Sequence, residues 1–131
     1  MPYLQLDTPY SHSTGLKQRF AQRMGEIYAQ QMGTRADRVT VAIRELGEGG
    51  IWRCGEQTPP RPAALLMCDI RRGRPAEQRA ELARLLVTAC CEVLGLTTDQ
   101  INLEFTQHAG DEMYHPMLGG LSEDWCEGEG R

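Results

Sequence analysis

An internal repeat of 62 residues constrains the fold of this chain more than any other feature. Each copy holds an alternating apolar run, then apolar residues at helical spacing that end at a glycine, and then a second alternating run. The two glycines, Gly33 and Gly95, lie 62 residues apart (95 − 33). The order strand, helix, strand therefore occurs twice, and a proline-rich linker at 58–62 joins the copies.

The repeat predicts an α+β fold in which two tandem β-α-β units form one four-stranded mixed sheet with both helices on one face. The expected strands are 3–7, 39–45, 65–70 and 101–106. We expect a single domain over 1–131, made of a first unit at 2–58, a second unit at 63–120 and an acidic tail at 121–131.

The strand segments suggest a sheet with apolar residues on both sides, and the helices cover only one of them. An uncovered apolar face favours association, so we expect a homo-oligomer that buries it. The alternative is a ferredoxin-like monomer in which the C-terminal tail covers the open face of the sheet.

The composition of the chain argues against several classes of binding partner. The 131 residues carry 14 Lys+Arg against 18 Asp+Glu, a net charge of −4, which disfavours a nucleic-acid partner. No apolar run approaches the roughly 20 residues that a membrane span needs, and the start does not resemble a secretory signal, so a cytoplasmic location is expected. Neither the five cysteines nor the histidines have metal-ligand spacing, so no metal or cofactor is expected and the histidines are interpreted as loop residues.

Pro2 is the first candidate catalytic residue. A small second residue normally allows removal of the initiator methionine, which would leave a proline amine at the start of the first strand. An α-amino group titrates near pH 8, and nearby cations or burial would lower that pKa enough to give a neutral base.

Arginines form the second candidate site. Lys17 is the only lysine, so a local cationic site here is made of guanidinium groups, which grip carboxylates with two hydrogen bonds. Arg71, Arg72 and Arg74 lie at the end of a buried strand, just before Pro75, which is placed to begin the second helix. In an extended segment Arg72 and Arg74 would point to one side and Arg71 to the other.

These features resemble the tautomerase superfamily. The resemblance rests on Met1-Pro2 before an alternating strand, on the repeat, and on the run GRPAEQR at 73–79, and it extends to about Tyr114. It implies the fold of the tautomerases and macrophage migration inhibitory factor, a homotrimer, and one proline site per subunit, because the 62-residue offset places Ala64 opposite Pro2. His12 likewise stands opposite Arg74.

Subgroups of this superfamily imply different site residues. In the malonate semialdehyde decarboxylases an aspartate, here Asp37, and two arginines separated by one residue, here Arg72 and Arg74, assist the proline. The cis-3-chloroacrylic acid dehalogenases have arginines three apart, as Arg71 and Arg74 are, and a histidine on the first helix where Tyr28 stands. Tyr28 lies on the apolar face of that helix and is also interpreted as a core residue.

The 4-oxalocrotonate tautomerases, including fused chains, have an aromatic residue after the second strand, and Trp52 occupies that place here. The offset pairs Trp52 with Tyr114, and both are candidates either for a pocket wall or for packing at a subunit interface. His12 and Thr40 stand where this subgroup has arginines.

The sequence therefore predicts an isomerase that uses Pro2 as a general base for keto-enol tautomerisation of a 2-oxo acid or related carboxylate, bound by the arginine cluster. One alternative is a lyase or hydratase, in which Pro2 and Asp37 decarboxylate or hydrate a short acid, or a dehalogenase acting on a three-carbon acid. Another is a non-catalytic trimeric binding protein.

Overall fold

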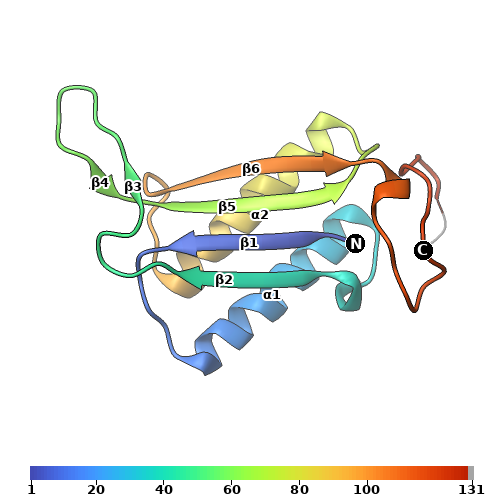
Figure 1. Ribbon diagram of the computed structural model, residues 1–131, viewed down its shortest axis with the longest axis horizontal. Coiled ribbons are helices and arrows are strands. Elements are labelled where there is room, and N and C mark those ends of the chain that lie inside the picture. Colours follow the sequence, from blue (N-terminus) through green and yellow to red (C-terminus); the bar gives the residue numbers. More distant parts are fainter. Residues whose placement is uncertain (130–131) are drawn as a thin grey trace.

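Four strands form one sheet in the order β2-β1-β5-β6 (Figure 1). They are β1 (Tyr3–Thr8), β2 (Thr40–Glu45), β5 (Ala64–Arg71) and β6 (Ile101–His108). The structure is a computed structural model that describes residues 1–129, so the last two residues of the predicted acidic tail lie outside the described part. Strand β1 runs parallel to β2, β5 runs parallel to β6, and the central β1–β5 pair is antiparallel. The predicted mixed sheet is confirmed.

Two helices of equal length cover one face of this sheet (Figure 1). Helix α1 (Thr14–Met32) begins after Ser13, whose side chain accepts a hydrogen bond from the Leu16 backbone N–H at 3.2 Å. Helix α2 (Ala76–Leu94) begins one residue later than predicted, because Pro75 precedes it in an extended conformation. Both helices end at the predicted glycines, which adopt the left-handed conformation, with φ of 68° at Gly33 and 75° at Gly95. Within residues 1–129, neither helix is long and apolar enough to span a membrane.

The core lies between the helices and the sheet. Alternate strand residues such as Leu4, Leu6, Leu66 and Cys68 are fully buried there. The helices contribute the matching side, with Phe20, Met24, Leu82, Leu86 and Cys90 among the fully buried residues. This alternation fixes the register, because a shift by one residue would turn every buried strand residue outward.

The open face of the sheet differs from the sequence-based expectation. It presents mainly polar side chains, which are Tyr3, Gln5, Asp7, Thr40, Arg44, Asp69, Asn102, Glu104 and Thr106. Arg44 donates two hydrogen bonds to the Asp7 carboxylate, at 2.7 and 3.1 Å. Only a few apolar residues, such as Leu65 and Met67, interrupt this surface. The expectation of an apolar open face was wrong, because strict alternation sends most apolar strand residues to the helices.

A small hairpin replaces part of the predicted linker. Strand β3 (Trp52–Arg53) pairs antiparallel with β4 (Arg61–Pro62), and the hairpin extends from one end of the sheet (Figure 1). Proline is tolerated there because both strands are edge strands. Two short 3-10 helices, η1 (Ala36–Arg38) and η2 (Gly110–Glu112), complete the structure.

The opposite end of the sheet gathers distant parts of the chain. The N-terminus, the start of β2 and the ends of β5 and β6 meet there, and the C-terminal segment lies beside them (Figure 1). That segment lies beyond the end of the strands (Figure 1). It does not cover the open face of the sheet, whereas the monomer alternative requires that it does.

Candidate active site

A small cavity of about 110 Å³ lies at the end of the sheet where the N-terminus and the C-terminal segment meet. Its walls come from the start of β1, α1, the η1 region, the end of β5 and the loop after η2. The lining residues are Met1, Pro2, Tyr28, Thr34, Arg38, Arg71, Arg74, His115, Leu118, Gly120 and Ser122. Of the predicted site residues, the structure brings Pro2, Arg71 and Arg74 together in this cavity.

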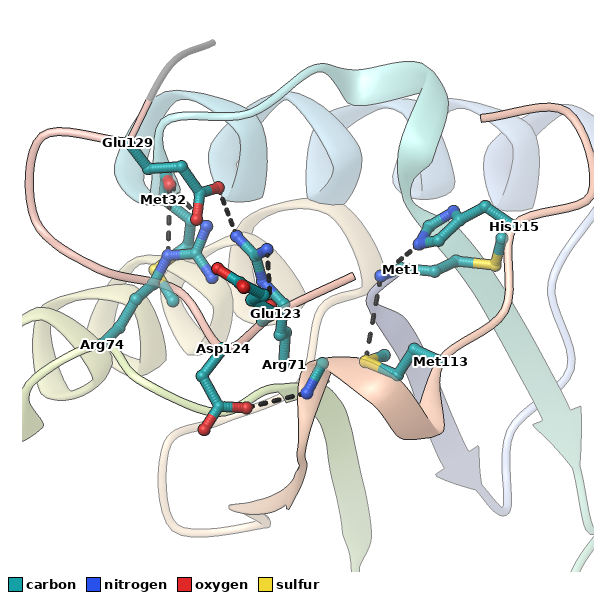
Figure 2. Close-up of polar contacts among 10 residues, drawn as sticks. Met1, Met32, Arg71, Arg74, Met113, His115, Glu123, Asp124 and Glu129 are labelled. Atoms are coloured by element: carbon teal, nitrogen blue, oxygen red, sulfur yellow. Dashed lines mark hydrogen bonds and ion pairs between the residues drawn. The ribbon is translucent and has the colours of Figure 1, made fainter. Parts of the chain in front are cut away.

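Pro2 is buried and held by the sheet, because its carbonyl oxygen accepts a hydrogen bond of 3.1 Å from the Thr40 backbone N–H at the start of β2. Met1 precedes it in the structure, and the Met1 amine points into the same cavity. The amine nitrogen lies 3.3 Å from His115 Nε2 and 4.0 Å from Met113 Sδ (Figure 2).

The environment of this amine favours its neutral form. Burial first, and then the positive charges of Arg71, Arg38 and Arg74, together lower the pKa of the Met1 amine from 8.0 to about 6, against a smaller opposing effect of Asp69. An amine with this pKa is largely deprotonated at pH 7 and holds an available lone pair. The cavity therefore holds a nitrogen base surrounded by cations.

Arg71 is the last residue of β5 and reaches the cavity from the sheet. Its guanidinium donates to the Glu123 carbonyl at 3.1 Å and forms an ion pair with the Glu129 carboxylate at 2.5 Å (Figure 2). The group that already binds Arg71 is thus a carboxylate from the C-terminal segment. A carboxylate is also the ligand that the sequence predicts for this arginine.

Arg74 is only 6% exposed and lies under the C-terminal segment. It donates two hydrogen bonds, at 3.2 and 2.9 Å, to the carbonyl of Met32 at the end of α1, and its guanidinium lies 5.1 Å from the Trp125 ring centroid. A cation is favourable there, because the last carbonyls of a helix carry partial negative charge. Arg74 therefore caps the C-terminal end of α1 and contributes positive charge to the cavity wall.

Arg38 lines the cavity too, and the sequence interpretation did not single it out. Its side chain is exposed, and among residues 1–129 no partner forms a hydrogen bond or ion pair with the guanidinium. This arginine follows Asp37 in η1, where the sequence interpretation favoured the carboxylate. A signal was available, because the beginning of β2 lies beside Pro2 in any parallel β1–β2 pairing.

Tyr28 and His115 are further cavity residues that sequence reasoning assigned to the core or to a loop. Tyr28 is 1% exposed, and burial raises its pKa to about 12, although Arg74 opposes the shift. His115 is 9% exposed, and its backbone is held in a tight turn by hydrogen bonds to Gly120. The sequence gives no local signal for His115, because its position depends on the path of the loop after η2.

Arg72 and Asp37 do not line the cavity. Gly73, with a φ of 133°, turns the chain after β5, so that Arg71 and Arg74 share the cavity while Arg72 points away. Arg72 is exposed and pairs with Asp124 at 3.3 Å. The expected orientation, with Arg72 beside Arg74, was wrong because the segment is not extended at Gly73. Asp37 is also exposed and pairs with Arg35.

Trp52 and Tyr114 lie outside the cavity as well. Trp52 belongs to the β3–β4 hairpin at the other end of the sheet, is 52% exposed, and donates its indole N–H to the Gly49 carbonyl at 2.9 Å. Tyr114 precedes His115 but is 66% exposed. Their roles in substrate binding or in subunit packing stay predictions.

Comparison with known proteins gives the fold. No protein-family model matches the sequence, and no curated protein matches it either. Among solved structures, Pt0534 inactivated by 2-oxo-3-pentynoate is 23% identical, with a TM-score of 0.75 over 92% of this chain and 94% of that one. N1, a member of the cis-3-chloroacrylic acid dehalogenase family, is 18% identical, with a TM-score of 0.81 over 93% and 85%.

A third solved structure, a fused 4-OT described as a symmetric trimer, is 21% identical, with a TM-score of 0.78 over 92% and 94% of the two chains. Macrophage migration inhibitory factors share the same architecture. The neighbours cover nearly all of the chain, as the predicted repeat required. The resemblance inferred from the sequence is confirmed for the fold, and the chain has the architecture of the tautomerase superfamily.

Proposed function

We propose that this protein is an isomerase that catalyses keto-enol tautomerisation of a small 2-oxo acid, with the Pro2 amine as the general base. The observation that carries the proposal is the Met1 amine, whose pKa falls to about 6 in a cavity that Pro2 also lines together with three arginines. Removal of Met1 places a secondary amine at the Pro2 nitrogen, in the same cavity and among the same charges. A base with a pKa near the working pH transfers protons efficiently.

The arginines supply the second requirement. Arg38 has a guanidinium without a partner among the described residues, and Arg71 already binds a carboxylate, that of Glu129. Guanidinium groups bind a substrate carboxylate with charge-assisted hydrogen bonds and stabilise negative charge that develops on an enolate. Asp37 lies outside the cavity, so its proposed part in decarboxylation or hydration has less support than the tautomerase reaction.

The size of the cavity favours a short acid. Its volume of about 110 Å³ is well below the roughly 300–1,000 Å³ of pockets that bury drug-sized ligands. Loss of Met1 adds the room of one residue. Pt0534, which shares the fold, is inactivated by 2-oxo-3-pentynoate, itself a short 2-oxo acid. We therefore propose 2-oxo acids of roughly this size as substrates.

Exchange of C3 protons tests the base directly. With 2-oxobutanoate in D2O, the native protein with a free Pro2 amine should replace the C3 protons by deuterium, which proton NMR measures. Acetylation of that amine should lower the exchange rate by about 100-fold or more, because an amide nitrogen has no basic lone pair. Mass spectrometry of the mature chain first establishes whether Met1 is absent.

Unchanged exchange after complete acetylation would contradict a Pro2 base. Absence of exchange in the native protein, together with saturable binding of 2-oxobutanoate, would instead support the non-catalytic binding protein.

Dehalogenation of a short unsaturated acid is the second candidate. It is favoured by the placement of Arg71 and Arg74, three residues apart, in one cavity, which is the spacing that the dehalogenase resemblance implies. The neighbour N1 belongs to a dehalogenase family. Release of chloride from cis-3-chloroacrylate distinguishes this reaction from tautomerisation.

We also propose that the chain assembles as a homotrimer. The outer strands β2 and β6 leave their edges unpaired within residues 1–129, and the hairpin that carries Trp52 extends away from the sheet (Figure 1). A symmetric trimer is known for the fused 4-OT that shares the fold. Sedimentation velocity gives the mass of the assembly.

A further inference from the structure

His115 lies in the cavity wall, and two backbone hydrogen bonds hold its position. Its backbone N–H donates to the Gly120 carbonyl at 3.0 Å, and the Gly120 N–H donates back to the His115 carbonyl at 2.9 Å. The resulting turn leaves the side chain 9% exposed, with the imidazole pointing at the Met1 nitrogen (Figure 2). The backbone thus fixes the direction of the ring.

The two ring nitrogens of His115 have different surroundings. Nε2 lies 3.3 Å from the Met1 amine, whereas Nδ1 is buried and has no hydrogen-bond partner within residues 1–129. An imidazolium would need acceptors for both N–H groups, and a buried N–H without an acceptor is costly. The favoured form is therefore a neutral imidazole with the proton on Nε2, which donates toward the amine.

The charged groups around the His115 ring also favour its neutral form. Burial lowers the pKa of His115, and the N-terminal amine, Arg38 and Arg71 lower it further, so none of these groups stabilises a second proton on the ring. A neutral imidazole next to cations is a hydrogen-bond donor for a substrate oxygen that becomes negative, and such a role is known for neutral histidine in enzymes that enolise carbonyl compounds.

Met1 separates His115 from Pro2. When Met1 is removed, the position that its nitrogen holds becomes available, and that position lies within hydrogen-bond distance of Nε2. A 2-oxo acid in this space has the Pro2 nitrogen on one side and the His115 N–H on another. Its carboxylate faces the arginines that line the same cavity.

We propose that His115 is a second catalytic residue, which donates its Nε2–H to the 2-oxo oxygen of the substrate and stabilises the enolate. This inference rests on the proposed function of Pro2. In the enolisation step, the Pro2 nitrogen takes a proton from C3, and the C3–H electron pair forms the C2=C3 double bond. The carbonyl π pair moves to oxygen, where the hydrogen bond from His115 holds the negative charge. Pro2 then releases its proton to the oxygen through water, which gives the enol and restores the amine.

Substitutions at His115 test this role in the exchange of the C3 protons of 2-oxobutanoate. H115A should lower kcat by about 100-fold, the usual cost of removing one donor to an enolate or oxyanion, while KM changes by less than threefold because the arginines remain. H115Q should recover at least tenfold of that loss, since the glutamine amide also offers an uncharged N–H. Circular dichroism and thermal unfolding show whether each variant is folded.

His12 offers a matched control, because its Nε2 is also buried without a partner in the described part of the chain, yet the residue lies outside the cavity. H12Q should exchange at the native rate. If folded H115A exchanges at the native rate, or if H115Q is as slow as H115A, the donor role of His115 is overturned and the Pro2 base remains. If the native protein does not exchange, the proposed function itself is overturned.

A spectroscopic measurement is independent of turnover. The 15N chemical shifts of the His115 ring in the native protein at pH 7 should be those of a neutral imidazole protonated at Nε2. An imidazolium, or the tautomer protonated at Nδ1, would overturn the proposal even if H115A were inactive.

Discussion

The two β-α-β units place equivalent positions at opposite ends of one sheet, and the two ends differ in chemistry. At the first end, Pro2 directly precedes β1 beside a cavity that holds the Met1 amine and is lined by arginines. At the second end, Ala64 begins β5, but its nitrogen is a peptide amide that donates to the Gln100 carbonyl at 2.8 Å. The backbone nitrogen of Ala64 is thus part of an ordinary hydrogen bond, whereas the equivalent nitrogen of Pro2 would become the proposed base once Met1 is removed.

The arginines at the two ends of the sheet also differ, in the groups that they bind. Near Ala64, Arg53 donates to the carbonyls of Asp99 and Gln100, and Arg61 lies 3.6 Å from the Asp99 carboxylate. Near Pro2, Arg38 has no such partner among the described residues, and Arg71 pairs with a segment that reaches it from the C-terminal end of the chain. Arg53 and Arg61 also line a pocket at the second end, but there the guanidinium groups are held by backbone carbonyls and by the Asp99 carboxylate.

Replacing one arginine at each end of the sheet by glutamine should give the largest difference in KM between the two ends. R71Q should raise KM for 2-oxobutanoate by about 10- to 100-fold, because a charge-assisted hydrogen bond contributes about 1.5–3 kcal/mol. R61Q, at the second end, should leave KM unchanged. Steady-state exchange kinetics of both variants measure the difference. Equal effects of R71Q and R61Q would mean that Arg71 does not bind the substrate.

The pH dependence of kcat/KM should show whether a free amine acts at the first end of the sheet, because an amide does not titrate in this range. In the proposed mechanism the neutral Pro2 amine is the active form, so kcat/KM should rise with pH through the pKa of that amine and then level off. Because burial and Arg71 lower the pKa of the Met1 amine in the same cavity, the midpoint for the Pro2 amine should lie below 8. A midpoint at 8 or above would show that the cavity does not tune the amine, and decreasing activity above the midpoint would show that the protonated form is active.

Substitution of Glu129 should change KM less than R71Q does. E129Q removes the carboxylate that pairs with Arg71, so KM for the substrate should fall by up to about fivefold, the limit for a partly exposed ion pair of about 1 kcal/mol. E92Q is the matched control, since Glu92 pairs with Arg23 on the surface of the helices. An unchanged KM in E129Q would indicate that substrate and Glu129 do not share Arg71.

Local pattern was enough to predict the strands, the helices and their glycine ends, because alternation and helical spacing are properties of short segments. It also singled out Pro2, Arg71 and Arg74, which line one cavity in the structure, although their roles stay predictions. It misjudged Arg72, since one glycine with a positive φ reverses the side to which neighbouring residues point. It missed His115, whose position depends on long-range contacts, among them the hydrogen bond from the Trp125 N–H to the Arg72 carbonyl at 2.9 Å.

The cavity joins the first residues of the chain to the C-terminal segment, and this has a practical consequence for recombinant work. A tag before Pro2 keeps its nitrogen an amide, and a tag at the C-terminus follows within a few residues of Glu129, which pairs with Arg71 (Figure 2). The β3–β4 hairpin lies at the far end of the sheet and has an exposed loop between Arg53 and Arg61. An affinity sequence inserted in that loop would leave both walls of the cavity in their native form.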